Sequence, residues 1–522
     1  MLLSHSHISS DQFGIKYDAV VVGSGPSGLT VARTMHEARR RVLVLEAGPA
    51  RPNRPGPDEA ILPMQDIGRP RRLSPTYSNQ IGGGSSLWHG VMGPLDDEDF
   101  EARTWIPHSG WPISQRDLAE HIESLADRFG YTEDYFHIER LPDDLRSLLS
   151  ALKFDHKTLQ NKLLLQATSP ARFGEDVEYI GRSEYVDLIS DCPVLELLGA
   201  SNSMAVSGLR VGSRNGSTTS ITVRENCAIV LCGGAQQNPR LLLNSRSRHP
   251  AGLGNSEDLV GRFLGDHPMG NAFQLRLAEP QRSGIYSEHL FKPGQKIRSG
   301  LRLNAKTAAE TGIPNHAVFL RPAFAAGLDD RTERVKLSLL TLAARKINVG
   351  DLLTLATNLN LARQVLAYKF SFPVRYDILD AFLVCEQTPN PESRVILSND
   401  TDAFGYRMPA VDWQVNSFDI ESVARFYSVV AGAIDPGFAR PIWTPSEAPW
   451  VDRFSSAAHH LGTCRMANSP KSGVVNENLR LFEASNVYVA DGSVFPTTGN
   501  ANPTVVASAL ARRLARHLVE RT

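Results

Sequence analysis

A histidine near the C-terminus has the chemistry of a proton acceptor. His459 lies three residues before the glycine of the segment Gly462-Thr463-Cys464. An imidazole has a reference pKa of about 6.5, so it can take up a proton around neutral pH. Asn502 stays neutral, and its amide can hold an oxygen atom without competing for that proton. His459 and Asn502 are therefore the candidate catalytic residues; the alternative is that His459 bonds a buried carbonyl and Asn502 caps the helix that follows.

A glycine-rich turn near the N-terminus suits the binding of a pyrophosphate. An apolar run at 17–22 ends in a G-x-G-x-x-G turn, and an acid follows 18 residues beyond the last glycine. The first glycine allows a tight turn, the second lets the backbone approach a pyrophosphate, and the third lets the helix pack on the strand. The acid suits ribose hydroxyls and would repel a 2′-phosphate, which disfavours NADP and leaves FAD and NAD open. The residues expected at this cofactor are Gly23, Gly25, Ser27, Gly28, Glu46 and Ala47.

Further glycines predict other contacts with the same cofactor. Three consecutive glycines at 82–84 permit the backbone to pass closely over a flat ligand. A flexible linker is the alternative, although a linker would rarely run directly into two large apolar residues, Leu87 and Trp88. Two more segments end apolar runs in small or acidic residues, at 232–235 and at 491–492. The additional candidates are Gly82, Gly83, Gly84, Ser85, Ser86, Leu87, Trp88, Gly233, Asp491, Gly492, Asn502 and Pro503.

The elements that must position these residues follow from the apolar patterns. Strands are expected at 17–22, 42–45, 227–231 and 487–490, and a helix at 29–37. Pro239 is expected to open a second helix, and Pro503 a third that runs to about residue 520, with Asn502 as its cap. Strand, glycine turn, helix and strand in this order indicate an α/β fold with a Rossmann-like domain.

Bulk properties exclude several classes of protein. With 522 residues the chain exceeds the roughly 250 to 300 residues of a single core, so at least two domains are expected. Because 55 Lys and Arg balance 56 Asp and Glu, there is no charge argument for nucleic-acid binding. The five cysteines are scattered and form no Cys-x-x-Cys pair, which favours a reducing compartment and a cytoplasmic location. Residues 1–16 do not resemble a secretory signal and are expected to form a flexible arm. The most apolar windows, 337–344 and 352–367, are bounded or interrupted by charged residues, so no membrane span is expected.

Taken together, these motifs resemble the glucose-methanol-choline (GMC) family of FAD oxidoreductases over nearly the whole chain. The resemblance implies a discontinuous FAD-binding domain at 17–272 and 454–522. A substrate-binding α+β domain at 273–453, an antiparallel sheet covered by helices, would be inserted between the two parts. It also implies that His459, and not His460, is the active-site base, and that Asn502 is the second active-site position.

The expected reaction is the FAD-dependent oxidation of an alcohol group on a small organic substrate. An alcohol releases hydride only as its hydroxyl proton leaves, so the site needs a base near the oxygen and an acceptor facing the carbon. Residues 109–112 are similar to those of sugar-oxidising family members, which favours a sugar or glycoside hydroxyl. Oxygen or another electron acceptor would take the electrons, and the oligomeric state stays open.

The chain departs from the family pattern at three residues. Asn238 stands where Ser or Thr is usual, and Trp88 stands where Asn is common. Leu87 occupies the position at which some members carry a histidine bonded covalently to the flavin. FAD is therefore expected to bind non-covalently, with His89 as the residue that complicates this expectation.

Other functions remain open at this point. An NAD(P)H-driven flavin monooxygenase shares the first glycine motif, but it gives no reason for His459 and Asn502. A non-redox flavin lyase or decarboxylase of the same fold, or an inactive FAD-binding module, is also conceivable. The pair Asp266-His267, before Pro268, is expected to be structural.

Overall fold

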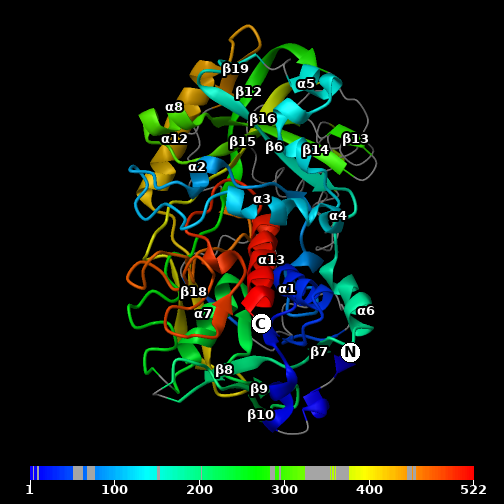
Figure 1. The fold of residues 1–522 in the computed structure, drawn as a ribbon. Coiled ribbons are helices and arrows are strands. Elements are labelled where there is room, and N and C mark those ends of the chain that lie inside the picture. Colours follow the sequence, from blue (N-terminus) through cyan, green and yellow to red (C-terminus); the bar gives the residue numbers. More distant parts are fainter. Residues whose placement is uncertain are drawn as a thin grey trace.

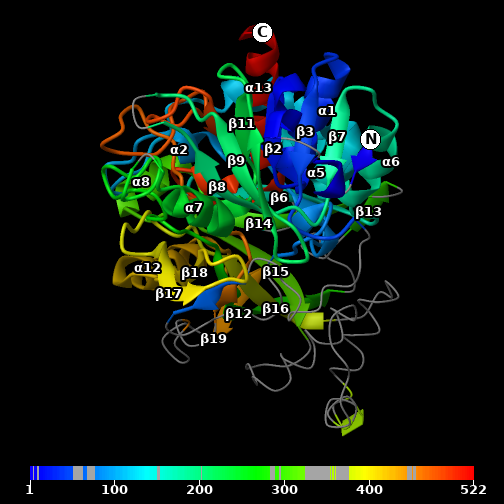
Figure 2. The same cartoon turned by 90° about the horizontal axis from the view of Figure 1, so that it is seen from below.

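A computed structural model defines the fold in two parts that follow each other along the long axis of the molecule (Figure 1). A parallel sheet with its helices forms one part, which carries both chain ends, and a large antiparallel sheet forms the other (Figures 1 and 2). The structure describes residues 1–3, 5–8, 11–50, 63–67, 77–149, 153–200, 203–247, 249–281, 289–292, 295–323, 353, 356–357, 359, 376–443, 450 and 454–521.

The parallel sheet has six strands in the order β1-β7-β3-β2-β11-β21. Its strands are β1 (Leu2–Leu3), β2 (Ala19–Val22), β3 (Val42–Leu45), β7 (Val186–Ile189), β11 (Ala228–Leu231) and β21 (Val487–Val489). All neighbouring pairs are parallel. The central strands are continuous apolar runs because both faces of such a sheet are buried. The Rossmann-like fold expected from the sequence is confirmed.

Three helices accompany this sheet, and the first of them contacts β2 and β3. They are α1 (Pro26–Glu37), α7 (Gly234–Asn244) and α13 (Thr504–Arg521), and α1 lies against α13. The expectation that Pro239 opens α7 is wrong, because the helix begins five residues earlier and contains the proline. Pro239 has no N–H for the carbonyl of Ala235, and the hydroxyl of Thr463 donates to that carbonyl instead, at 2.7 Å.

The antiparallel sheet has nine strands. Its main path is β19-β12-β16-β15-β14-β6-β5, with β13 on β14 and β20 on β12. The strands are β5 (Val91–Met92), β6 (Leu159–Ala167), β12 (Pro268–Gln281), β13 (His289–Lys292), β14 (Gln295–Leu303), β15 (Ala317–Ala323), β16 (Tyr376–Val384), β19 (Ala439–Trp443) and β20 (Ser455–Ser456). Helix α12 (Ser417–Ala433) contributes Phe426 and Val430 to a core shared with Phe273 and Leu383 of this sheet.

Two smaller sheets complete the strands. β8 (Val194–Leu198), β9 (Gly208–Gly212) and β10 (Thr218–Thr222) form one, and β17 (Arg394–Thr401), β18 (Arg407–Asp412) and β4 (Gln65–Asp66) form the other. The division into an FAD-binding and a substrate-binding domain stays a proposal. The topology adds that β5 and β6, which precede residue 273, pair within the large antiparallel sheet.

The remaining elements are short. They are η1 (His5–His7), η2 (Asp11–Lys16), η3 (Gly83–Ser86), α2 (Asp97–Phe100), α3 (Arg116–Glu123), α4 (Ala126–Phe129), η4 (Glu133–Phe136), η5 (Ile138–Arg140), α5 (Asp143–Leu149), η6 (Phe173–Glu175), α6 (Asp176–Gly181), α8 (Ala305–Thr311) and η8 (Gly492–Val494). In the expected arm at 1–16, β1 pairs with β7, so this part of the arm extends the parallel sheet. Among the described helices none has the length and apolar character to cross a membrane. Residues 337–344, and most of 352–367, lie outside the described residues.

Candidate active site

The three glycines after β2 differ in what surrounds them. Gly23 has a φ of 99°, and a Cβ placed on it would lie 2.7 Å from the carbonyl oxygen of Cys232. A Cβ on Gly28 would lie 2.0 Å from the carbonyl oxygen of Gly23. A Cβ on Gly25, in contrast, would meet no atom within 4 Å among the described residues. The first and third glycines therefore serve the chain itself, and Gly25 leaves open space at the N-terminus of α1.

The second glycine loop lies directly against the first. The backbone N–H of Gly82 donates to the carbonyl of Ser24 at 3.0 Å, and a Cβ on Gly83 would lie 2.9 Å from the Cα of Gly25. A Cβ on Gly84 would meet nothing within 4 Å in the described structure. Two glycine backbones thus border a space that side chains would fill, which fits a dinucleotide between them.

The N-terminus of α1 adds donors to this space. Its N-cap is Gly25, whose missing side chain makes no capping hydrogen bond, and Ser27 lies in the first turn. Free backbone N–H groups at a helix start carry partial positive charge and suit a pyrophosphate.

Glu46 lies at the end of β3, next to the glycine turn. One carboxylate oxygen accepts from the backbone N–H and the hydroxyl of Ser24, at 2.9 and 2.6 Å, and the other accepts from the N–H of Gly48 at 2.8 Å. Burial raises the pKa of this carboxyl, while these hydrogen bonds oppose the increase. Ala47 links Glu46 to Gly48, and a Cβ on Gly48 would collide with the carbonyl of Asn79. The buried side-chain amide nitrogen of Asn79 has no partner among the described residues, so a polar donor is left for a ligand near Glu46.

The rest of the 82–88 loop is held by hydrogen bonds within the protein. The hydroxyl of Ser85 donates to the carbonyl of Gly82 and accepts from the N–H of Phe173. The hydroxyl of Ser86 donates to the carbonyl of Gly83 at 2.9 Å. The indole of Trp88 donates to the carbonyl of Ala171 at 2.9 Å. Leu87 ends the loop with a partly buried side chain.

Gly233 and Asp491 meet through Asn238. The amide oxygen of Asn238 accepts from the N–H of Gly233 at 2.8 Å, and its amide nitrogen donates to Asp491 at 2.8 Å. Asp491 also accepts from the N–H of Gly234 and from Ser493. Burial raises the pKa of Asp491, against these hydrogen bonds. Asn238, noted in the sequence only as a departure from the family, thus joins the ends of β11 and β21.

Gly492 connects this cofactor end to the histidine segment. A Cβ on Gly492 would lie 2.6 Å from Leu461, and its carbonyl accepts from the N–H of Gly462 at 3.2 Å. The segment that carries His459 is therefore packed against the turn after β21.

His459 and Asn502 are in contact. The imidazole Nε2 of His459 lies 3.0 Å from the amide nitrogen of Asn502, and the imidazole Nδ1 lies 2.8 Å from Nδ1 of His267. His267 is fully buried, and its Nε2 lies 3.1 Å from the carbonyl oxygen of Thr498. The expected catalytic pair is thus brought together, with a second imidazole behind it that sequence analysis assigned to a structural role.

These distances define which ring nitrogens carry protons. The carbonyl of Thr498 can only accept, so Nε2 of His267 carries a proton and its Nδ1 presents a lone pair. Nδ1 of His459 must then donate to that lone pair. Burial, followed by the neighbouring His267, lowers the pKa of His459 to about 3, so its ring is neutral. The lone pair of His459 therefore lies on Nε2, where it accepts from the amide of Asn502.

The backbone turns His459 toward His267. The segments pair antiparallel at Pro268 with Ser456 and at Gly265 with Leu461. The chain advances three positions from Gly265 to Pro268 but five from Ser456 to Leu461, so one side bulges. Ala458 lies in the bulge with a φ of 62°.

The carboxylate of Asp266 bonds the backbone of both His267 and His459. One oxygen of its fully buried carboxylate accepts from the backbone N–H groups of His267 and His459, at 2.6 and 3.0 Å. The other accepts from Ser456 and lies 3.8 Å from the ring of His460. Burial alone would raise the pKa of Asp266, but the neighbouring imidazoles of His460 and His459 lower it below its usual value. Asp266 is therefore an anion close to the two histidines. Its contact with His459 joins residues far apart in the chain, and the sequence spacing gave no signal for it.

The loop before α13 positions Asn502 from both parts of the fold. Thr497 donates to the carbonyl of Asp99 and accepts from the indole of Trp111, each at 2.8 Å. Asn500 donates to Asp96 and to the carbonyl of Asn315. α13 begins one residue later than expected, at Thr504, directly after Pro503. Trp111 is buried and bonds this loop, so its side chain does not present an exposed face to a substrate.

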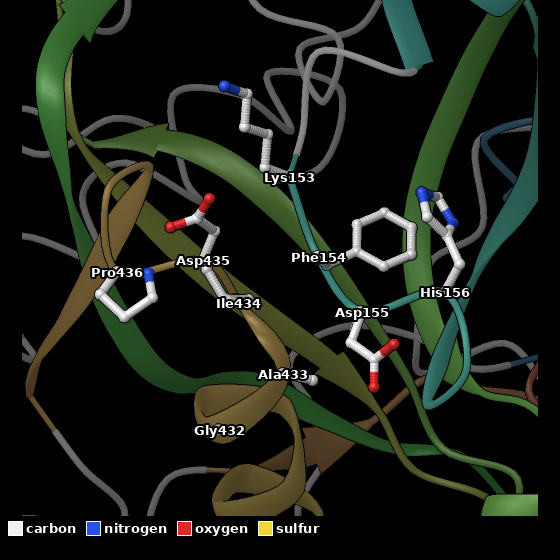
Figure 3. Close-up of a pocket in the computed structure, with 9 residues that line it drawn as sticks. All are labelled: Lys153, Phe154, Asp155, His156, Gly432, Ala433, Ile434, Asp435 and Pro436. Atoms are coloured by element: carbon white, nitrogen blue, oxygen red, sulfur yellow. The ribbon is translucent and has the colours of Figure 1, made fainter.

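A separate pocket of about 420 Å³ lies at the far end of α12. Figure 3 shows its lining residues on two segments, Lys153 to His156 before β6 and Gly432 to Pro436 at the end of α12. Backbone hydrogen bonds join the two segments, from Asp155 N–H to Ala433 and from Asp435 N–H to Lys153. None of the predicted site residues lines this pocket.

Known proteins match the chain in the segments that carry these features. A family model described as GMC oxidoreductase matches residues 389–511, and a model described as NAD(P)-binding Rossmann-like domain matches residues 21–51. The first includes His459, Asp491 and Asn502, and the second includes the glycine turn and Glu46.

Similar proteins cover nearly the whole chain. A 2-methyl-1,2-propanediol dehydrogenase of Mycolicibacterium austroafricanum is 23% identical over 97% of this chain and 95% of its own. A paromamine 6'-oxidase of Streptomyces fradiae is 23% identical over 96% of this chain and 91% of its own. The crystal structure of pyridoxine 4-oxidase from Mesorbium loti superposes with a TM-score of 0.55 at 19% identity, over 96% of this chain and 99% of that one. Together these matches support a GMC-family, FAD-dependent oxidoreductase of alcohol groups.

Proposed function

We propose that His459 is the base that removes the hydroxyl proton of the alcohol, and that Asn502 holds the same oxygen. The observation that carries this proposal is the 3.0 Å contact between Nε2 of His459 and the amide nitrogen of Asn502. An alcohol oxygen that replaced this hydrogen bond would accept from the amide and donate its proton to the imidazole. FAD, when bound, supplies the acceptor for the hydride.

The binding site for FAD is proposed along the two glycine loops. Gly25, Gly84 and the first turn of α1 would face the pyrophosphate, and Glu46 would face the ribose, with the amide of Asn79 beside it. Gly233, Asp491 and Gly492 would border the cofactor from β11 and β21. Backbone donors dominate this surface, as a phosphate ligand requires.

Replacement of His459 by Ala tests the base. We expect flavin reduction by an active alcohol to slow by about 10² to 10⁴, or roughly 3 to 5 kcal/mol of barrier, the usual worth of a positioned base. Anaerobic stopped-flow absorbance measures the rate. His460→Ala is the matched control and is expected to lose much less, since adjacent residues of an extended segment point to opposite faces and the ring of His460 lies 3.8 Å from Asp266. Equal losses of rate in the two variants would show that the assignment of the base to His459 is wrong.

We further propose a polyhydroxylated substrate, with a sugar or glycoside hydroxyl as the group oxidised. One relative that spans nearly the whole chain is named for 2-methyl-1,2-propanediol, a diol, and another that matches 55% of the chain is named for fructose, a sugar. Anaerobic bleaching of the flavin by matched panels of sugars, glycosides, polyols, simple alcohols and sterols measures the preference. Faster bleaching by simple alcohols or sterols than by any sugar or glycoside would contradict the proposal.

A further inference from the structure

We infer that His267 is a positioning residue that holds His459 in the one neutral tautomer able to accept a substrate proton. The inference rests on the proposed role of His459 as the base. It concerns a residue that does not touch the substrate oxygen, because its ring lies behind His459 and bonds the protein at both nitrogens.

The argument begins at the carbonyl of Thr498. That oxygen lies 3.1 Å from Nε2 of His267, and a carbonyl cannot donate, so this nitrogen keeps its proton. The Nδ1 of the neutral ring is then an acceptor. Nδ1 of His459 lies 2.8 Å away and has no other hydrogen-bond partner within the described structure. A proton on Nε2 of His459 instead would leave two lone pairs facing each other at that distance.

The surroundings make this arrangement rigid. The rings of His267 and His459 are almost perpendicular to each other, with centroids 5.1 Å apart, and His267 is inaccessible to solvent. The backbone N–H groups of the two histidines share one oxygen of Asp266, so neither residue can shift without the other. Thr498 is itself tied to Gln387, whose N–H donates to the Thr498 hydroxyl at 3.1 Å. The carbonyl of Thr498 therefore fixes the tautomer of His267, and His267 in turn fixes the tautomer of His459.

Burial lowers the pKa of His459 and so disfavours its protonated state, and the carboxylate of Asp266 offsets part of this effect. When Nε2 of His459 accepts a proton, the ring becomes an imidazolium whose Nδ1–H still donates to His267. Asp266 lies beside both rings as an anion, and the hydrogen bond becomes charge-assisted. His267 thus has the same hydrogen-bond role before and after proton transfer, and no group has to reorient.

Two substitutions separate the acceptor role from the bulk of the ring. In His267→Asn the amide oxygen can occupy the place of Nδ1 and accept from His459, whereas His267→Leu fills the space without an acceptor. We expect the limiting rate of anaerobic flavin reduction to fall about tenfold or more in H267L and to stay within about threefold of the parent in H267N. The substrate concentration at half-maximal rate is expected to change little in either variant, because the substrate is held at the other face of His459.

The tautomer itself is measured by ¹⁵N NMR of the histidine rings in the flavin-loaded protein without substrate. The parent and H267N are expected to show His459 with a proton on Nδ1 and none on Nε2, assigned by loss of the signals in His459→Ala. In H267L the proton is expected on Nε2. His316→Leu is the control, since His316 is an equally buried imidazole bonded to Ser422 and Glu386, and the tautomer of His459 should persist there.

Two outcomes would overturn the inference. One is a His459 ring in H267L that keeps its proton on Nδ1, and the other is equal reduction rates in H267L and H267N. The ring spectra are recorded without substrate, so a failure of His459 as the base would appear only in the reduction rate of His459→Ala. The two proposals can therefore fail separately.

Discussion

The histidine proposed as the base is neutral because of where it lies. Burial is the main cause that lowers the pKa of His459 to about 3, and the adjacent His267 lowers it further. The carboxylate of Asp266 acts in the opposite direction but does not overcome burial. A base that is already unprotonated needs no activation before it meets a substrate hydroxyl.

A flat pH profile follows from this pKa. A histidine with a pKa of about 6.5 would lose its unprotonated fraction about thirtyfold between pH 8 and pH 5. For His459, protonation begins only as the pH falls toward 3, so the limiting rate of flavin reduction should stay constant within about twofold from pH 8 to pH 5. Stopped-flow reduction at a saturating alcohol concentration measures it. A loss of tenfold or more over this range would show that burial does not keep the base neutral.

At the scale of elements, two glycine loops from different parts of the chain form one surface. In the loop after β2, a side chain at Gly23 or Gly28 would collide with neighbouring backbone. A Cβ on Gly25 or Gly84 would meet no described atom within 4 Å. The difference separates glycines that the fold needs from glycines that a ligand needs.

Gly25→Val should remove FAD and leave the protein folded. Gly25 has a φ of −68°, which valine can adopt, and its added side chain begins in open space. We expect loss of the flavin absorbance after gel filtration, with little change in the melting temperature of the apoprotein. Gly181→Ala, also in open space but on α6, should keep the flavin. Gly23→Val should instead lower the melting temperature, because Gly23 has a φ of 99° and its Cβ would meet Cys232. Retention of full flavin content in Gly25→Val would remove this loop from the proposed site.

The second loop leads to a prediction about how FAD is attached. Leu87, at the end of η3, has no nucleophilic atom that could bond the flavin methyl group, so FAD is expected to bind without a covalent bond. Precipitation of the protein in acid should release all yellow colour into the supernatant. Flavin that stays in the pellet would contradict the prediction, and a His89→Ala variant would then show whether His89 is the attachment point.

On the scale of the whole molecule, polar networks join the two parts of the fold at the site. Arg103 forms a buried ion pair with Glu386, the residue after Cys385, and Asn315 bonds both Asp96 and Asp99. The loop that carries Asn502 is attached to this network. The proposed catalytic pair thus lies where these networks connect the two parts of the fold.

A single dinucleotide motif for the whole chain predicts the source of electrons. The sequence contains one G-x-G-x-x-G turn in a strand-turn-helix context, and it is assigned to FAD. Neither NADH nor NADPH is therefore expected to bleach the flavin at a rate comparable to an active alcohol. Anaerobic mixing with each nicotinamide is the measurement, and rapid bleaching would favour a monooxygenase instead.

The sequence by itself determined the elements with local signals. The apolar runs at 17–22, 42–45 and 227–231 contain strands β2, β3 and β11 of the parallel sheet, because a strand buried on both faces must be continuously apolar. The pairing of His459 with Asn502 came from a family resemblance, and the structure brings the two side chains within 3.0 Å.

Only the tertiary structure decided what lies behind the base. His267 was expected to be structural because it stands at the predicted junction of the two domains, and no periodicity relates residue 267 to residue 459. The contact arises from an antiparallel pairing with a bulge at Ala458, and its register depends on both segments at once. Likewise, α7 tolerates Pro239 because Thr463, distant in the chain, satisfies the carbonyl that the proline leaves free. Local sequence specifies local hydrogen bonds, whereas a buried polar group far along the chain finds its partner only when the whole chain has packed.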